Sequence, residues 1–540
     1  MQHAIRSAVG GPLLVLGMLV WPAVGRAGSA DPTIVHTDTG AVRGLREDGV
    51  LAFKGIPYAA SPSGALRWKP PQAPAAWSGI RDTTQFGPGC PQLARYGLTE
   101  AGYNEDCLSI NVTVPPAHNM PAGAKRPVIA WIYGGAFVGG STAIYPLAHM
   151  ALSGDEIVVS FNYRLGVFGF MASSAFARDS DGSYGLADQR AALRWIQRNI
   201  AAFGGDPNNV TVAGESAGAG SICMHLVAPT ETTGLFSKAI IQSANCSQQL
   251  RTLDEADRVG EKVAKLVSCA PGAGQLACLE SKSVKDMLDA ASTVAGSDIM
   301  MYVPSVGASG VPEQPRAALK AGRFVHVPII NGGNRDELRL YVAYALQSGG
   351  KVTRENYADV LRTAYGDKTD RILAEYPPSA YSSPAAAIGT VMSDYRPDNG
   401  LNNCGFLETG KLASAHGPVF QYEFADRDAP PVTENPGFEM GAVHSSELPY
   451  QFPGFSNTTR LDGPPLKPGS QRLATVMMAY WTSFAATGAP SARQSPVWTP
   501  FVSAARVMRL EPGKTGFFDA GAVHHCAFWR LLYPANFSPP

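Results

Sequence analysis

The feature that most constrains this chain is a serine flanked by two glycines, GESAG at residues 214–218, which directly follows a short apolar run. That run, VTVA at residues 210–213, is typical of a buried strand, and residues 219–227 contain no proline and can begin a helix. A serine on so sharp a turn leaves no room for side chains two positions before or after it. The segment therefore predicts a strand, a tight turn and a helix, with the hydroxyl of Ser216 lifted clear of the sheet edge, as a nucleophile requires.

A second glycine-containing turn, YGGAF at residues 133–137, ends another apolar run upstream. Glycine lets the backbone approach a bound molecule closely and aim its N–H groups inward. We expect the amides of Gly135 and Ala136, together with that of Ala217, to form an oxyanion hole. Either motif alone could be a structural turn, but their order along the chain favours a reactive serine site.

Four short apolar runs predict an α/β fold with a mostly parallel sheet. They lie at residues 127–133, 157–161, 210–213 and 327–330. Continuous runs of this length suit parallel strands that are covered on both faces. Between the second and third run, residues 186–203 carry apolar side chains at helical spacing, which indicates a crossover helix.

The second half of the chain has weaker patterns. Residues 340–440 predict helical cap or lid segments, and residues 450–475 predict a surface loop rich in proline and glycine. Residues 473–487 predict a helix, because Met477, Met478, Trp481 and Phe484 lie on or near one face. With 540 residues, 45% hydrophobic and 16% charged, the chain has the composition of a globular protein with a large core.

The N-terminus has the three-part pattern of a secretory signal. Arg6 precedes an almost wholly apolar run over residues 8–24, and small residues around Ala27 and Ala30 suit cleavage. The alternative is a membrane anchor, but the run is short for a span. We expect residues 1–30 to be a cleaved signal peptide and residues 31–540 to be one domain, exported to the periplasm or the medium and without stable membrane insertion.

The charge balance excludes some partners. Removing residues 1–30 takes away Arg6 and Arg26 and no acid, which leaves 42 basic and 44 acidic residues and a net charge of −2. A near-neutral protein has no electrostatic reason to bind nucleic acid or an anionic membrane. We therefore expect no nucleic-acid partner.

Eight cysteines become candidates for disulfides once export is assumed, at positions 90, 107, 223, 246, 269, 278, 404 and 526. Proline and glycine between Cys269 and Cys278 suit a small closed loop, and Cys90 and Cys107 bracket another loop-like stretch. Spacing alone leaves the connectivity open. No spacing is typical of a zinc site, so we expect neither a metal nor a cofactor.

Several further motifs, in order along the chain, resemble those of the type-B carboxylesterase family, the group of carboxylesterases, cholinesterases and bile-salt-activated lipase. The resemblance runs nearly end to end through FKGIPYA at residues 53–59, EDCLSINV at 105–112, FNYRLG at 161–166 and FGGDP at 203–207. It implies an α/β-hydrolase fold, with a mostly parallel central sheet flanked by helices and with helical cap or lid insertions.

The resemblance also implies the partners of Ser216. The family's acid lies in a stretch like NRDE at residues 334–337, which indicates Glu337, and its base in a stretch like GAVH at 441–444, which indicates His444. From the residues alone, Asp336 competes with Glu337, and a lone histidine is more often structural. Glu215 is either an electrostatic support or a buried hydrogen-bonded carboxylate, and Ser243 matches a family serine that hydrogen-bonds near the triad.

The family's disulfides imply the pairs Cys90–Cys107 and Cys269–Cys278, with Cys404–Cys526 as a third candidate. Cys223 is then expected to be a buried free thiol, and Cys246 has no obvious partner.

The chain also departs from the family pattern. Ala136 stands where many members have a third glycine, Leu338 replaces a glycine after the acid, and Ser445 and Ser446 follow the histidine in place of the more usual residues. No tryptophan lies between Cys90 and Cys107, whereas cholinesterases use one there to bind choline.

We therefore expect a serine esterase that acts through an acyl-enzyme on small to medium carboxylic esters. Amide hydrolysis and lipase activity are alternatives on the same residues, and a non-catalytic binding protein of the same fold is a third. The natural ester and the oligomeric state do not follow from the sequence.

Overall fold

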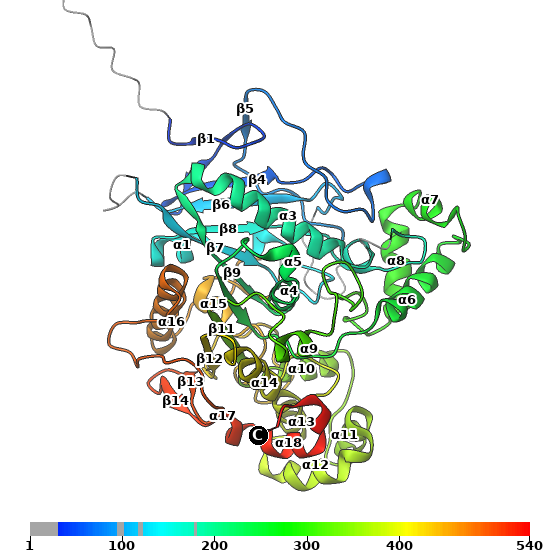
Figure 1. Ribbon diagram of the computed structural model, residues 1–540. Coiled ribbons are helices and arrows are strands. Elements are labelled where there is room, and N and C mark those ends of the chain that lie inside the picture. Colours follow the sequence, from blue (N-terminus) through cyan, green and yellow to red (C-terminus); the bar gives the residue numbers. More distant parts are fainter. Residues whose placement is uncertain (1–30, 94–101, 117–122, 178–180, 459, 540) are drawn as a thin grey trace, which may run out of the picture.

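The structure of the protein is a computed structural model that describes residues 31–93, 102–116, 123–177, 181–458 and 460–539. A large sheet runs through its centre, and helices pack against both faces of this sheet (Figure 1). The predicted α/β-hydrolase fold, with a mostly parallel sheet between helices, is confirmed. The predicted signal peptide at residues 1–30 lies outside the described residues.

The described residues form an eleven-stranded sheet in the order β14-β13-β12-β11-β10-β9-β7-β8-β6-β4-β3. Its strands are β3 (Leu45–Glu47), β4 (Val50–Pro57), β6 (Ser109–Val114), β7 (Arg126–Ile132), β8 (Ile157–Phe161), β9 (Gly205–Glu215), β10 (Lys238–Gln242), β11 (Ile329–Asn334), β12 (Val419–Phe424), β13 (Val507–Leu510) and β14 (Gly516–Phe518). In this order, the strands from β13 through β7 to β8 are all parallel. The pairings outside them, β14 with β13 at one edge and β8-β6-β4-β3 at the other, are antiparallel. A second, small sheet joins β1 (Ile34–His36), β2 (Ala41–Arg43) and β5 (Ile80–Asp82).

The four predicted apolar runs all form or overlap central strands, namely β7, β8, β9 and β11. Strands β10 and β12 were not predicted. The expectation that residues 340–440 are helical cap segments is wrong for β12, which lies inside that range and is buried along its whole length. Gln421 and Glu423 interrupt its apolar run, and both are nevertheless buried, where Gln421 accepts from Asn331 and Glu423 contacts His524.

The helices are α1 (Ala148–Gly154), α2 (Gly166–Phe170), α3 (Tyr184–Asn199), α4 (Ala217–Leu226), α5 (Pro229–Thr232), α6 (Leu253–Leu266), α7 (Gln275–Glu280), α8 (Val284–Ala295), α9 (Pro315–Lys320), α10 (Arg339–Gln347), α11 (Tyr357–Tyr365), α12 (Thr369–Glu375), α13 (Pro384–Asp394), α14 (Asn403–Ser414), α15 (Leu448–Gln451), α16 (Pro468–Thr487), α17 (Ala520–Val523) and α18 (Cys526–Leu532). Helices α3, α4 and α14 cover one face of the sheet, and α1 and α16 pack together on the other (Figure 1). Among the described helices, none is both long and apolar enough to cross a bilayer.

The predicted surface loop at residues 450–475 is shorter than expected. Helix α16 begins at Pro468, five residues before the predicted start at Leu473. Proline at the first helical position suits this early start, because its fixed φ is helical and its missing N–H has no partner there anyway.

Four disulfides link the described cysteines, and none of these residues is left as a free thiol. The pairs Cys90–Cys107, Cys269–Cys278 and Cys404–Cys526 agree with those that the resemblance implied.

The expectations for the other two cysteines are wrong, because Cys223 bonds to Cys246 and is not a free thiol. Helix α4 begins where β9 ends, and β10 lies parallel beside β9, so the segment after β10 returns next to α4. The two Cα atoms are therefore only 5.1 Å apart.

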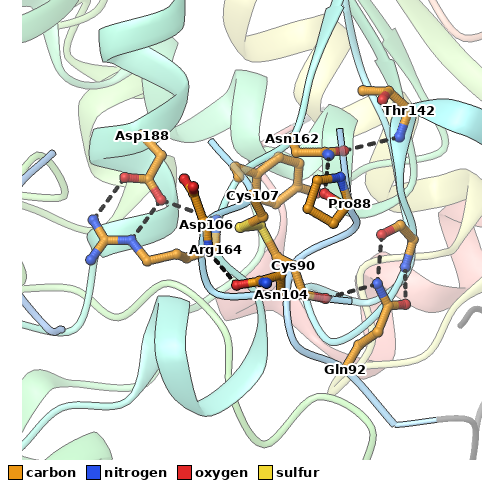
Figure 2. The surroundings of a disulfide bond; sticks show 12 residues. Pro88, Cys90, Gln92, Asn104, Asp106, Cys107, Thr142, Asn162, Arg164 and Asp188 are labelled. Carbon is orange, nitrogen blue, oxygen red and sulfur yellow. Dashed lines mark hydrogen bonds and ion pairs between the residues drawn. A yellow bond between two sulfur atoms is a disulfide. The ribbon is translucent and has the colours of Figure 1, made fainter. Parts of the chain in front are cut away.

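The disulfide between Cys90 and Cys107 lies among many hydrogen-bonded polar side chains (Figure 2). Arg164, just after β8, forms a bidentate ion pair of 2.7 and 2.8 Å with Asp188 of α3, and its amide also donates to Asp188. Asn162 links two loops, because its side chain donates to the carbonyl of Pro88 and accepts from the amide of Thr142. The ion pair and the side-chain amide of Asn162 are both buried, so these contacts fix the loops at the carboxyl end of β8.

Candidate active site

Ser216 lies at the tip of the predicted strand–turn–helix segment. It is the single residue between β9 and α4, with φ of 55° and ψ of −124°. This conformation is costly for a residue with a side chain, and the tight packing around it maintains the turn. A Cβ atom on Gly218 would lie 1.9 Å from the carbonyl oxygen of Ile132, and one on Gly214 would lie 2.7 Å from the same atom. The steric reason for both glycines is therefore borne out.

His444 joins Ser216 to Glu337 through a continuous chain of hydrogen bonds. Its Nε2 lies 2.9 Å from Oγ of Ser216, and its Nδ1 lies 2.7 Å from Oε2 of Glu337. The main chains of the two loops also meet, because the amide of His444 donates to the carbonyl of Glu337. Three side chains from widely separated parts of the sequence thus converge at the carboxyl ends of β9 and β11.

The structure separates the two carboxylates that compete for the histidine. Glu337 is fully buried, and its second oxygen, Oε1, accepts from the hydroxyl of Ser243 at 2.5 Å and from the amide of Asn334 at 2.8 Å. Asp336 points elsewhere and forms ion pairs with Arg427 and Arg339. Glu337, and not Asp336, therefore reaches the imidazole.

Glu215 places a second carboxylate against His444. Its Oε1 lies 3.2 Å from Nε2 of the imidazole and accepts from the hydroxyl of Ser445 at 3.0 Å. The serine that departs from the family pattern thus contacts this carboxylate. Burial raises the pKa of Glu215 to about 8, because the charged form loses its water, although the nearby His444 acts in the opposite direction.

The charge state of His444 follows from the same neighbours. Burial alone lowers the pKa of the imidazole, but the charges of Glu215 and Glu337 outweigh burial and raise this pKa to about 9. The site therefore favours the positively charged imidazolium, which is the form a base acquires when it takes a proton.

Glu447 is a third buried carboxylate, whose role was not recognised in the sequence. It accepts hydrogen bonds from the side chains of Asn334 and Gln242, and Gln242 in turn accepts from the indole of Trp481. Burial, reinforced by the charge of Glu337, raises the pKa of Glu447. Only its position three residues after His444 could have drawn attention to it.

The turn at residues 134–137 has an unusual backbone. Gly135, Ala136 and Phe137 have φ angles of 118°, 53° and 62°. The amides of Gly135 and Ala136 find no acceptor within the described part of the chain. The amide of Ala217 is the first of helix α4, where N–H groups have no intrahelical acceptor. These three donors are therefore available to a bound oxygen near Ser216.

The ring of Tyr341, on α10, lies beside the imidazole and belongs to a small apolar cluster. The ring of Tyr341 lies 6.0 Å from that of His444, and Tyr341 packs with Tyr344 beside Leu340 and Val443. No sequence signal distinguished these residues, because apolar side chains on a short helix are usually core residues. Among the described residues, no three side chains of the metal-binding types are grouped so that they could hold a metal ion.

The chain is similar to several known proteins along most of its length. The model of the carboxylesterase family matches residues 31–529. Fumonisin B1 esterase of Sphingopyxis macrogoltabida is 34% identical, and the alignment covers 88% of this chain and 86% of the relative. Para-nitrobenzyl esterase of Bacillus subtilis is also 34% identical, over 85% of this chain and 90% of the relative. The crystal structure of a carboxylesterase from Geobacillus stearothermophilus superposes with a TM-score of 0.77 and 32% identity, over 92% of this chain and 99% of that one.

Proposed function

This chain belongs to the carboxylesterase family and is a carboxylic ester hydrolase, and we propose that Ser216, His444 and Glu337 are its catalytic triad. The observation that carries the proposal is the hydrogen-bonded chain from Oγ of Ser216 through both ring nitrogens of His444 to a buried carboxylate of Glu337. A nucleophile, a base and an orienting acid in this arrangement are what acyl transfer requires.

In the proposed mechanism, Nε2 of His444 takes the proton of Ser216 while Oγ attacks the ester carbonyl. Glu337 accepts the hydrogen bond from Nδ1, which fixes the tautomer that can receive the proton and stabilises the imidazolium that forms. His444 then gives its proton to the leaving alcohol, and an acyl-enzyme remains on Ser216. Water, deprotonated by His444, then attacks the acyl carbonyl, and the bond to Oγ of Ser216 breaks to release the carboxylic acid while His444 returns the proton to Oγ.

The oxyanion of each tetrahedral intermediate is proposed to bind the amides of Gly135, Ala136 and Ala217. Support comes from the left-handed backbone at Gly135 and Ala136 and from the position of Ala217 at the start of α4. Donors of this kind are fixed before the reaction, so they need no reorganisation as the charge develops.

Ser243 and Glu215 are proposed to position the triad. Ser243 binds the far oxygen of Glu337, and Glu215 lies beside the nitrogen that exchanges the proton. For the substrate we propose small to medium carboxylic esters. The alternatives are amide and lipid ester hydrolysis on the same residues.

We also propose that residues 1–30 are a cleaved signal peptide and that the mature chain, residues 31–540, folds as one domain in the periplasm or outside the cell. Four disulfides support export, because such bonds persist in oxidising compartments. The family match also begins at residue 31. Edman sequencing of the exported protein tests this, and an intact Met1 in the membrane fraction would contradict it.

The triad is tested with short-chain p-nitrophenyl esters and an organophosphate label. The parent should turn over the esters and take up the label at Ser216, and Ser216→Ala should do neither. Ser174→Ala, at an exposed serine outside the site, is the matched control and should behave like the parent. A Ser216→Ala variant that keeps full activity would refute the assignment, and faster turnover of the matched p-nitroanilides than of the esters would favour the amidase alternative.

A further inference from the structure

Helix α3 carries three arginines, Arg190, Arg194 and Arg198, spaced four residues apart on one face. Arg198 forms an ion pair with Asp38 at 2.7 Å, and Arg194 forms one with Glu231 at 3.3 Å. Within the described part of the chain, no carboxylate lies within ion-pair distance of Arg190. One cationic group of the three is therefore not neutralised.

Arg190 is also the most deeply placed of the three, with 2% of its surface exposed. Its Nη2 donates to the carbonyl of Gly310 at 3.2 Å, and its Nε has no hydrogen-bond partner. Gly310 has φ of +71°, and a Cβ atom there would lie 2.0 Å from Nη2, so the glycine makes room for the guanidinium. Burial lowers the pKa of Arg190 to about 10. A buried charge without a partner is unfavourable, and such groups are normally paired.

A cavity of about 310 Å³ lies against this face of α3. Arg190 lines it together with Ser183, the residue just before the helix, whose hydroxyl is buried and has no hydrogen-bond partner. Pro70, Pro71 and Ala191 also line the cavity, and they form an apolar wall. Arg194, Arg198 and Glu231 also line the cavity, but each of these charges has an ion-pair partner. The cavity therefore combines unsatisfied donors on Arg190 and Ser183 with paired charges and an apolar surface.

We propose that this cavity binds a small monocarboxylate, with Arg190 and Ser183 donating hydrogen bonds to its oxygens. Both groups can donate, and a guanidinium matches the planar geometry of a carboxylate. The single unpaired positive charge suits a monoanion, and the prolines with Ala191 suit a short aliphatic body. The site is separate from Ser216 and His444, because neither lines the cavity.

Butyrate is the probe, titrated calorimetrically into the mature protein at constant ionic strength. Arg190→Gln should weaken butyrate binding at least about tenfold, because a charge-assisted hydrogen bond is lost. Ser183→Ala should weaken it less. Arg323→Gln removes an exposed arginine that is paired with Glu313 outside the cavity, so it is the matched control and should bind like the parent. Ester hydrolysis should persist in Arg190→Gln, which separates this proposal from that of the triad.

Three outcomes would overturn the proposal. Unchanged butyrate affinity in a folded Arg190→Gln variant would overturn it. Butyrate would then bind elsewhere, such as near Ser216, where the substitution has no effect. Binding of inorganic phosphate in place of butyrate would exclude the monocarboxylate. If Arg190→Gln does not fold, crystals of the parent soaked with 3-bromopropionate provide the answer. An anomalous bromine peak beside Ala191 supports the site, and the absence of such a peak refutes it.

Discussion

Oε1 of Glu215 lies 3.2 Å from Nε2 of His444, the ring nitrogen that also faces Oγ of Ser216. The imidazole is therefore held between two buried carboxylates, because Glu337 occupies its other nitrogen. Glu337 fixes the ring, whereas Glu215 is close to the proton that moves. We therefore expect substitutions of Glu215 and of Glu337 to have different effects on activity.

The first prediction concerns pH. His444 must be neutral to act as a base, and its pKa is raised to about 9, so kcat/KM should increase as the pH rises towards 9. Glu215→Gln removes a charge that raises this pKa, and the acid limb of the pH profile should move down by about one unit or more. Stopped assays across the pH range measure this shift. Glu355→Gln, at an exposed position, should leave the profile in place, and an unmoved profile in Glu215→Gln would contradict the contact.

The second prediction compares the adjacent carboxylates. Glu337→Gln keeps the size of the side chain but removes the charge that orients and stabilises the imidazolium, so kcat should fall by about 10⁴-fold. Asp336→Asn leaves His444 untouched but weakens the ion pairs with Arg427 and Arg339, so it should lower the melting temperature more than it lowers kcat. Steady-state kinetics and thermal unfolding of both variants check the contrast. A larger loss of kcat in Asp336→Asn would reverse the assignment.

The third prediction concerns a buried histidine outside the active site. Nδ1 of His524 lies 2.6 Å from Asp394, and its Nε2 contacts Glu423, so the imidazole links the C-terminal segment to α13 and β12. Burial lowers the pKa of His524, but Glu423 and Asp394 outweigh burial and raise it to about 10. This folded-state pKa lies above the ordinary value of 6.5, so the contribution to stability is complete below 6.5 and is lost as the pH rises through 10.

His524→Asn should therefore lower the free energy of unfolding by about 3–5 kcal/mol near neutral pH, because it leaves buried carboxylates without their partner. The loss should shrink above pH 10. His525→Asn is the matched control, since the side chain of the neighbouring His525 is partly exposed and its contact with Glu375 should contribute at most about 1 kcal/mol. Chemical denaturation at several pH values measures both. Equal effects of the two substitutions would contradict the buried ion pair.

The fourth prediction concerns the disulfide that the sequence did not indicate. Thiol titration of the denatured, non-reduced protein should detect no free cysteine, because the structure pairs all eight. Replacing Cys223 and Cys246 together by alanine should lower the free energy of unfolding by about 3 kcal/mol, through the entropy of the unlinked unfolded chain. Removing Cys269–Cys278, which closes a shorter loop, should cost less. Two free thiols in the parent would refute the Cys223–Cys246 pair.

The parts of the fold that the sequence predicted are those encoded locally. The turn at Ser216 could be recognised because its glycines and its flanking strand and helix are contiguous. Strand β12 was missed because Gln421 and Glu423 hide its apolar character, and only partners on other elements make these residues suitable for the core.

The candidate site could likewise be predicted from local sequence only in part. Glu337 and His444 were identified by resemblance, since nothing in the local sequence brings residues 107 positions apart into contact. The pair Cys223–Cys246 follows from the parallel alignment of β9 and β10, which cysteine spacing does not reveal. The roles of Glu447 and His524 depend on three or more distant segments meeting in the core, so no local motif could reveal them.

The disulfide between Cys404 and Cys526 has a consequence for the integrity of the molecule. The two cysteines are 122 positions apart, and His444 lies between them, so the proposed base is carried on a covalently closed ring. A protease that cuts one peptide bond anywhere in this ring leaves both fragments attached to each other. Nicked protein would keep its full mass in a non-reducing gel and separate into two bands only after reduction.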